Sequence, residues 1–189
     1  MLKPIDKEVE IHSIKLLSKK GGKSNLAKKT KREISSAVIV VSDSVSAGKA
    51  EDKSGQKIVE HLEKWGVENP DFSIVADEQI QIRGKVESLC ENGCQLVITT
   101  GGTGLSPRDV TTESLSEIID REIPGIMEAA RSYGQQRTPY AMLSRSIAGI
   151  KGKTLILTLP GSSKAVVESM TVLFPYVLHI FDVLEGQRH

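Results

Sequence analysis

Apolar residues recur with two different spacings along the chain from residue 35 onward. Short apolar runs typical of strands occupy residues 37–43, 71–77, 95–100 and 153–160, and the β-branched run at residues 96–98 is of the kind that is buried on both faces of a sheet. Stretches with the spacing of an amphipathic helix cover residues 52–66, 81–93, 111–120, 124–136 and 160–170, and a mostly apolar last helix is predicted over residues 172–184. Strand and helix therefore alternate through most of the chain.

This alternation predicts an α/β fold. Helices of this length between strands favour right-handed crossovers, which give a mostly parallel sheet with helices on both faces. We therefore expect a three-layer α/β/α sandwich. Ligands of such sheets bind beyond the carboxyl ends of the strands, so the loops that follow the strands form the candidate site.

The most informative loop follows the third strand and reads TTGGTGLSPRDVTT. Gly101, Gly102 and Gly104 allow the backbone to turn closely around an anion. Thr111 can cap the next helix, so a purely structural junction is the alternative, although such a turn does not require three glycines beside a charged pair. Arg108 can pair with a phosphate or with a neighbouring acid, and the sequence does not decide between the two.

The same edge of the predicted sheet gathers hydroxyls and carboxylates from several loops. They belong to Ser42, Ser46, Ser54, Thr100, Thr103 and Ser162, and to Asp43, Asp52, Asp77 and Asp109. Phosphate is bound by hydroxyls, amides and helix N-termini, whereas carboxylates repel it unless a divalent cation lies between them. The loops therefore imply Mg²⁺ and phosphoryl or nucleotidyl transfer. Asp52, Asp77 and Ser162 each have a structural alternative, because each can cap the helix that follows it.

Charge divides the chain near Glu33. Residues 1–32 contain ten Lys or Arg and three Asp or Glu, whereas the remaining residues contain 15 Lys or Arg and 21 Asp or Glu. The net charge of the 189-residue chain is therefore only +1. We interpret residues 1–33 as a basic arm with a linker and residues 34–189 as one α/β domain. The arm lacks interleaved aromatic residues, so nucleic-acid binding is not expected.

Several other classes of protein lack their sequence signals here. No apolar run approaches the roughly 18 residues of a membrane helix, and the first residues lack the apolar core of a signal peptide, so we expect a cytoplasmic protein with no membrane partner. The glycine loop has neither the Lys of a P-loop nor the spacing of a dinucleotide fingerprint. Cys90 and Cys94 lack the further ligands of a zinc site, and no nucleophile elbow is present.

Five ordered motifs resemble the MoaB/MogA family of molybdenum-cofactor biosynthesis proteins, which includes the corresponding domains of gephyrin and the plant Cnx proteins. The motifs are VSDSVSAGKAEDKSG, ADE, TTGGTGLSPRDVT, REIPGIMEAAR and MLSRSIAGIKGKTLILTLPGSSKAV, within residues 35–184. The resemblance implies a three-layer α/β/α fold and adenylylation of molybdopterin, in which the terminal phosphate of the pterin attacks the α-phosphate of Mg-ATP and expels pyrophosphate. The implied cofactor is Mg²⁺, with ATP as co-substrate.

The resemblance also implies roles for individual residues. Asp77 and Asp109 are similar to the family's essential carboxylates and would act as Mg²⁺ ligands or orienting groups. Neither need act as a base, because the attacking phosphate is already ionised at neutral pH. The other positions would bind phosphates or close the pocket around them, namely Ser46, Gly48, Asp52, Ser54, Gly101, Gly102, Thr103, Gly104, Gly161 and Ser162.

The implied partners are molybdopterin, ATP and further copies of the chain, because members of the family form homotrimers or homohexamers. A non-catalytic molybdopterin-binding or scaffold protein of the same pathway is the alternative. Residues 1–24 resemble the C-terminal end of MoaC, the cyclic pyranopterin monophosphate synthase, with Lys3, Lys19 and Lys23 in matching positions. The arm would then be the remnant of a fusion whose main MoaC portion is missing, because two dozen residues cannot form a core of their own. We expect no MoaC activity, because the partner residues that would precede Lys3 are absent.

Overall fold

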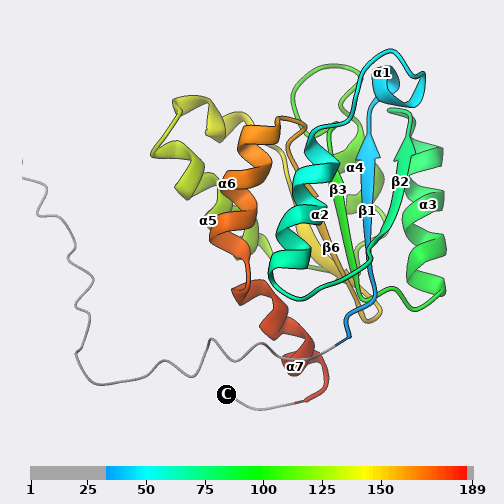
Figure 1. Cartoon of the computed structure of the whole chain (residues 1–189), viewed down its shortest axis with the longest axis vertical. Helices are drawn as coiled ribbons and strands as arrows, with labels where there is room; N and C mark the ends of the chain where they lie inside the picture. Colours follow the sequence, from blue (N-terminus) through cyan, green and yellow to red (C-terminus); the bar gives the residue numbers. More distant parts are fainter. Residues whose placement is uncertain (1–32, 187–189) are drawn as a thin grey trace, which may run out of the picture.

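The computed structural model describes residues 33–186, so the basic arm lies almost wholly outside the described part of the chain. Within that part, six strands form one sheet in the order β2-β1-β3-β6-β5-β4. Figure 1 shows the first four of them, β2, β1, β3 and β6, side by side. β1, β2, β3 and β6 are parallel, whereas β5 is antiparallel to β6 and β4 is antiparallel to β5. The bounds are β1 Ser36–Val41, β2 Asp71–Val75, β3 Leu96–Thr100, β4 Arg121–Glu122, β5 Ala148–Lys151 and β6 Thr154–Leu159.

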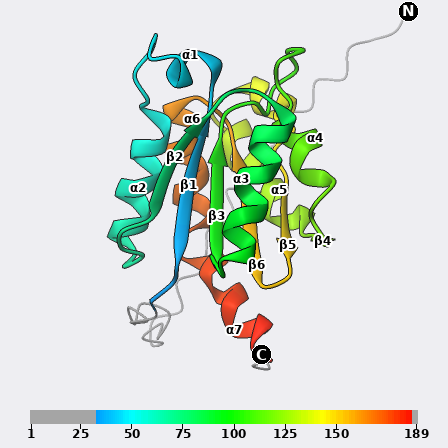
Figure 2. The ribbon, with the colours of Figure 1, turned by 90° about the vertical axis from the view of Figure 1, so that its right-hand side faces the viewer.

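Helices cover both faces of the sheet (Figure 2). One face packs against α2 (Ser54–Lys64), α5 (Pro124–Gln135) and α6 (Ser163–Leu173), and the other against α3 (Gln79–Glu91) and α4 (Thr111–Ser116). Shorter elements are α1 (Asp43–Ser46), η2 (Pro139–Leu143), η3 (Tyr176–His179) and α7 (Ile180–Leu184). The predicted three-layer α/β/α sandwich with a mostly parallel sheet is confirmed.

Strand β1 shows why the central strands are apolar at nearly every position. Successive side chains of a strand point to opposite faces of the sheet. Val38 therefore packs with Ile58 and Leu62 of α2, whereas Ile39 packs with Ile82 of α3, and all five side chains are fully buried. Because helices cover both faces, neither set of alternate positions meets solvent.

The sequence pattern missed the two antiparallel strands β4 and β5. β5 and β6 are joined by the two-residue turn Gly152–Lys153, in which Gly152 has a φ of 58°. Glycine suits the first position of such a hairpin turn, because other residues rarely adopt a positive φ. β4 is only two residues long, Arg121–Glu122, and its pairing with β5 depends on residues distant in sequence. Neither strand is long enough to show a period of its own.

The prediction of one continuous helix over residues 172–184 is wrong. Helix α6 ends at Leu173, and the chain breaks at Pro175 before η3 and α7. Proline lacks a backbone N–H and disfavours helical geometry at the preceding residue, here the buried Phe174. Within residues 33–186, no single helix has the length and apolar character to cross a membrane, and α6 with the η3–α7 segment passes only as a pair bent by 51°.

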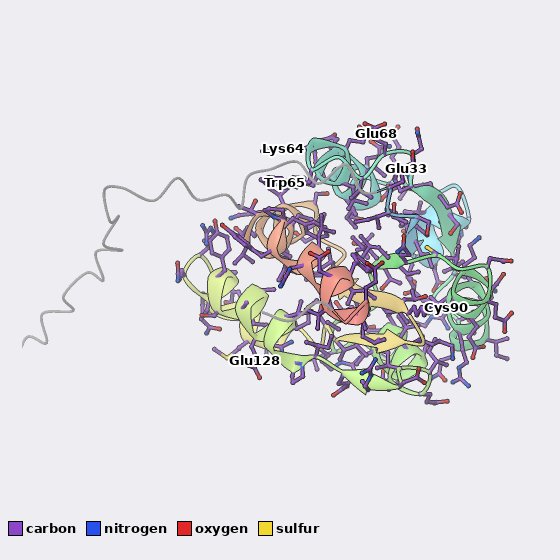
Figure 3. The ribbon with its side chains drawn as sticks, turned by 90° about the horizontal axis from the view of Figure 1, so that it is seen from below. Glu33, Lys64, Trp65, Glu68, Cys90 and Glu128 are labelled. Carbon is purple, nitrogen blue, oxygen red and sulfur yellow. The ribbon has the colours of Figure 1, made fainter. Side chains whose placement is uncertain are left out.

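The two ends of the parallel strands differ in character. Figure 3 views the end at which these strands begin, where Lys64 and Trp65 mark the end of α2 and Cys90 lies near the end of α3. The glycine loops lie at the opposite end, where β1, β2, β3 and β6 finish (Figure 1). The fold therefore brings the predicted loops together at one edge of the sheet.

Candidate functional site

The glycine loop after β3 closes tightly onto the end of β1. Gly101 and Gly102 have φ values of 102° and 63°, which side-chain-bearing residues rarely adopt. A Cβ atom on Gly101 would lie 2.1 Å from the carbonyl oxygen of Val41, and one on Gly102 would lie 2.3 Å from Thr111 Oγ1. Glycine is therefore required at both positions on conformational and on steric grounds.

Thr111 fastens the loop rather than capping α4. Its backbone N–H donates to the carbonyl oxygen of Gly102 at 3.0 Å, and its hydroxyl donates to that of Gly101 at 2.9 Å. The N-cap residue of α4 is Val110, which has no side-chain acceptor. The alternative interpretation, in which Thr111 caps α4, is therefore wrong.

Arg145, from the segment before β5, holds the second half of the glycine loop. Its Nε donates to the carbonyl oxygen of Gly104 at 2.6 Å, and Nη2 donates to that of Asp109 at 2.7 Å. Its backbone N–H donates to the carbonyl oxygen of Thr103 at 3.0 Å. Nη1 pairs with Glu113, and this contact holds the pKa of the Glu113 carboxyl below its usual range. One side chain thus fixes the backbone before the Pro-Arg-Asp segment and at its last residue.

Asp43, Asp77 and Arg108 connect the loops that follow β1, β2 and β3. The N–H of Asp43 donates to Asp77 Oδ2 at 2.8 Å, and the N–H of Asp77 donates to Asp43 Oδ1 at 3.0 Å. Arg108 donates from Nε and Nη2 to the two carboxylate oxygens of Asp43, at 3.0 Å each, and from Nη2 to Glu78 Oε1 at 2.9 Å. The sequence left open whether Arg108 pairs with a phosphate or with an acid, and in the structure it pairs with the carboxylates of Asp43 and Glu78.

The pKa values of the two hydrogen-bonded aspartates, Asp43 and Asp77, are shifted in opposite directions. The N–H of Asp77, and then the Arg108 guanidinium, hold the pKa of Asp43 below its ordinary value. Burial raises the pKa of Asp77, and the nearby negative charges of Asp43 and Asp109 raise it further. The hydrogen bond from the Asp43 N–H and the positive charge of Arg108 lower it, but the net shift is upward. The negative charge of Asp77 is therefore held at a free-energy cost, which a bound cation would relieve.

Two cavities meet at the carboxyl ends of the strands. The smaller, of about 350 Å³, lies between the loop after β1 and the glycine loop, and charged side chains on its wall include Asp52, Lys53, Asp77 and Asp109. The larger, of about 510 Å³, has walls from α5, α6 and η2, and its mostly apolar lining includes Met127, Ala130, Gly134, Leu143 and Ala165. The two cavities share Gly102, Asp109 and Gly161.

Most of the residues predicted for the site line one of these cavities. Those on the smaller cavity alone are Asp52, Ser54, Asp77 and Gly101, and those on the larger alone are Thr103, Gly104 and Ser162. Gly102, Asp109 and Gly161 border both. Asp77 and Asp109 thus converge on one cavity, as the sequence argument required.

Ser46 and Gly48 line neither cavity. The Ser46 hydroxyl donates to the carbonyl oxygen of Asp43 at 3.1 Å inside α1, and Gly48 adopts a φ of 68° just after it. The ligand-binding roles of both residues stay predictions. Asp52 does carry out the predicted alternative role, because its carboxylate accepts the N–H groups of Ser54, Gly55 and Gln56 at 3.0, 2.9 and 3.1 Å. Asp52 therefore caps α2 while also facing the smaller cavity.

Ser162 immediately precedes α6, but its hydroxyl makes no capping hydrogen bond. The alternative that treated Ser162 as a hydroxyl cap is not supported, and its side chain lines the larger cavity. A ligand there could therefore use this hydroxyl together with the first amides of an 11-residue helix.

Sequence reasoning missed several charged residues of this region, including Glu51 on the smaller cavity and Arg131 on the larger. Lys53 adds a cation to the smaller cavity, Glu168 adds a carboxylate to the larger, and Arg145 fixes the glycine loop. Lys53 was within reach of sequence reasoning, since it directly follows Asp52 in a loop already assigned to the site. Glu168 and Arg145 carried no comparable signal, because one lies on an ordinary helix face and the other in a loop that precedes a missed strand.

The donor set around the smaller cavity suits a cation that also binds phosphate. Asp77 Oδ2 is used by the N–H of Asp43, and Asp109 Oδ2 accepts the N–H of Ser106 at 2.7 Å, which leaves one oxygen of each carboxylate. Among the residues that the structure describes, no group of three or more His, Cys, Asp or Glu could enclose a metal. Mg²⁺ commonly uses one or two carboxylates and completes its shell with water and substrate phosphates. The two aspartates therefore fit Mg²⁺ that arrives with a phosphorylated ligand.

An open α/β sheet with a glycine loop, converging carboxylates and paired cavities at its carboxyl edge defines a protein that binds a phosphorylated ligand. The model of the family described as "Probable molybdopterin binding domain" matches residues 37–179. The chain therefore belongs to this family of molybdenum-cofactor biosynthesis proteins.

Individual relatives agree with this assignment. The chain is 40% identical, over its whole length, to the molybdenum cofactor biosynthesis bifunctional protein of Chlorobaculum tepidum, and spans 60% of that protein. It is 38% identical over 152 residues to the molybdopterin adenylyltransferase of Helicobacter pylori, covering 79% of the chain and 86% of the relative. The crystal structure of MoaB, a molybdopterin biosynthesis enzyme of Thermus thermophilus, superposes with a TM-score of 0.75 and 38% identity, over 82% of the chain and 98% of MoaB.

Proposed function

We propose that this chain transfers the adenylyl group of ATP to the terminal phosphate of molybdopterin and releases pyrophosphate. The observation that carries the proposal is the contact of a polar and an apolar cavity at Gly102, Asp109 and Gly161. The larger cavity suits the flat pterin, and the smaller suits the triphosphate. A phosphate attached to the pterin then meets the α-phosphate beside Asp109. The Helicobacter pylori relative, which is named for this activity, supports the proposal.

The reaction requires no general base. An ionised oxygen of the molybdopterin phosphate attacks the α-phosphorus of ATP, the bond from this phosphorus to the oxygen that bridges to the β-phosphate breaks, and pyrophosphate leaves with that electron pair. The backbone N–H groups of the glycine loop and the ammonium of Lys53 would hold the phosphates in line. The work of the chain is therefore mainly positioning and charge stabilisation.

Asp77 and Asp109 are the residues that would hold Mg²⁺. When bound, Mg²⁺ supplies positive charge that neutralises the charge developing on the leaving pyrophosphate. Without the cation, the two carboxylates would repel the triphosphate that enters the same cavity. This accounts for acidic residues in a phosphate site, and it implies that ATP and Mg²⁺ bind together.

Other expectations from the sequence accompany this proposal. The match to the bifunctional protein includes residues 1–32, which supports their interpretation as a MoaC-like segment. The division into residues 1–33 and 34–189, the homotrimeric or homohexameric assembly and the cytoplasmic location stay predictions. Sedimentation of the purified chain would measure its assembly.

The direct test is incubation of the purified chain with molybdopterin, ATP and Mg²⁺, followed by measurement of adenylylated molybdopterin and pyrophosphate. We expect both products in equal amounts, and their loss in the variant Asp109→Asn. Asp71→Asn is the matched control, because Asp71 is exposed at the start of β2. Binding of molybdopterin with no pyrophosphate release would contradict the proposal and favour the scaffold alternative.

A further inference from the structure

Glu168 contributes a carboxylate to the helical wall of the larger cavity. It belongs to the face of α6 from which Ala165 and Ser169 also line that cavity, as their spacing of three and four residues allows. Its side chain is only 15% exposed. A carboxylate thus faces the larger, mostly apolar cavity from a helix and does not line the smaller cavity in which the triphosphate is proposed to bind.

The acceptor capacity of Glu168 is largely unused. Within residues 33–186 its carboxylate accepts no hydrogen bond, and its ion-pair contact is with Arg137 Nε at 3.6 Å. Arg137 has other partners, because Nη1 donates to the carbonyl oxygen of Tyr133 at 2.8 Å and the guanidinium lies 3.6 Å above the Tyr133 ring. A charged group largely removed from water is stabilised by hydrogen-bond donors, so a ligand that supplies them would be favoured at this position.

The surroundings restrict the shape of such a ligand. Met127, Ala130 and Leu143 give the cavity apolar surfaces, which suit the faces of a flat ring system. The cation on the same wall, Arg131, already donates to the carbonyl oxygen of Ser146 at 2.9 Å. A ligand beside Glu168 should therefore combine apolar faces with N–H donors along one edge.

We propose that Glu168 determines the specificity for pterin, by accepting two parallel hydrogen bonds from the 2-amino-4-oxopyrimidine edge, one from ring N3–H and one from the 2-amino group. This rests on the proposed function and adds the orientation of the substrate. Glu168 lies five residues beyond Ser163, where α6 begins, or roughly 7.5 Å along the helix. The pyrimidine edge then faces α6, while the phosphate lies at Gly102 and Asp109. Paired N–H donors match the two oxygens of one carboxylate.

Two pteridines that differ at one edge provide the test. Pterin presents N3–H and a 2-amino group, whereas lumazine presents N3–H and a 2-oxo group, which would face the carboxylate with an acceptor. The full chain is titrated with each compound, and each is also used as a competitor of molybdopterin. We expect the wild type to prefer pterin, and Glu168→Gln to bind pterin and molybdopterin about ten- to a hundredfold more weakly.

The glutamine variant should also reverse the preference. Its amide oxygen can accept N3–H while its amide N–H donates to the 2-oxo group, so lumazine should bind this variant at least as well as it binds the wild type. A structural role of Glu168 would not produce such a reversal. Equal weakening of both compounds, unchanged pterin affinity, or a wild type that binds neither compound would overturn the proposal.

Matched controls separate recognition from packing. Glu128→Gln makes the same change at an exposed position of neighbouring α5, labelled in Figure 3, and should leave every affinity unchanged because Glu128 lines neither cavity. Arg137→Gln removes the partner of Glu168 and reports on the ion pair alone, so we expect little change in the ratio of the pterin and lumazine affinities. A shift of that ratio in Arg137→Gln equal to the shift in Glu168→Gln would count against recognition by Glu168.

Failure of this proposal is distinguishable from failure of the proposed function. If the chain adenylylates molybdopterin and Glu168→Gln retains the wild-type KM for it, the function stands and the role of Glu168 falls. If no adenylylation occurs but Glu168→Gln still reverses the pteridine preference, the role of Glu168 stands and the catalytic function falls. The KM for ATP should be the same in the wild type and in Glu168→Gln, because Glu168 does not line the smaller cavity.

Discussion

Asp43 and Asp77 exchange hydrogen bonds, because the backbone N–H of each donates to the carboxylate of the other, at 2.8 and 3.0 Å. The exchange joins the loop after β1 to the loop after β2. Arg108 extends the connection to the loop after β3 through its contacts with Asp43. The positions of Asp77 and Asp109 relative to each other are therefore set by contacts between loops, and several of the expected effects below follow from this arrangement.

Asp77→Asn should raise stability and lower activity. The asparagine keeps an oxygen for the N–H of Asp43 but removes a charge that burial disfavours. The pKa of Asp77 is higher in the folded chain than in the unfolded chain. Its contribution to the free energy of unfolding is therefore fully present at a pH below the pKa of the unfolded chain, and it is lost as the pH rises through the pKa of the folded chain. We therefore expect a higher Tm than wild type at about pH 7 and a smaller difference near pH 3.

Adenylylation should fall by about two to three orders of magnitude in Asp77→Asn, because a proposed Mg²⁺ ligand is lost. Thermal unfolding across that pH range and product formation at neutral pH are the two measurements. A variant that is less stable than wild type at neutral pH would show that the charge of Asp77 is not a cost to the fold.

Arg108→Lys should affect activity more than stability. Arg108 and its partner carboxylates are about half exposed, at 55%, 48% and 53%, and ion pairs of this kind contribute less than about 1 kcal/mol. Lysine cannot reproduce the two-pronged contact with Asp43, so the loops carrying Asp77 and Asp109 should lose their fixed separation. We expect adenylylation to fall about ten- to a hundredfold.

The control for this substitution is Arg83→Lys, since Arg83 pairs with Glu117 outside both cavities. Steady-state rates and chemical denaturation of the two variants should be compared side by side. Equal activity of Arg108→Lys and wild type would show that Arg108 does not position the site.

Gly101→Ala should destabilise the fold by roughly 2 kcal/mol or more. The new methyl group would lie 2.1 Å from the carbonyl oxygen of Val41, and the residue would keep a positive φ. Gly84→Ala is the contrasting change, because Gly84 is exposed within α3 and a Cβ there has no neighbour within 4 Å. It should stabilise the chain by about 0.5–1 kcal/mol, since alanine favours the helix. Equal midpoints of urea unfolding for the two variants would refute the steric explanation.

Arg145→Lys should weaken both the fold and the site. The substitution removes donors to the carbonyl oxygens of Gly104 and Asp109, and we expect a loss of about 1–3 kcal/mol in the free energy of unfolding. The KM values for ATP and molybdopterin should both rise, because the glycine loop borders both cavities. Arg121→Lys on the exposed strand β4 should change neither quantity. Wild-type KM values in Arg145→Lys would show that the loop holds its shape without this side chain.

Much of the candidate site followed from residue types and their order. The glycines of the loop after β3 indicated a phosphate site, because a backbone that must turn with positive φ needs them, and Gly101 and Gly102 have that geometry. Asp77 and Asp109 were expected to meet because each follows a parallel strand, and the carboxyl ends of such strands lie at one edge. Arg145 and Glu168 escaped notice, since their contacts involve segments more than 30 residues away in sequence or a cavity between helices.

The sequence by itself determined the layers of the fold and the chemistry of its loops. Helical and strand periods, together with runs that are apolar at nearly every position such as β1, are local properties that specify a sheet buried on both faces. Tertiary structure alone decided that Arg108 pairs with Asp43, that Thr111 fastens the glycine loop, and that two cavities meet at Asp109. The physical reason is that side-chain partners and cavities depend on distances between loops and helices, which the order of residues along the chain does not encode locally.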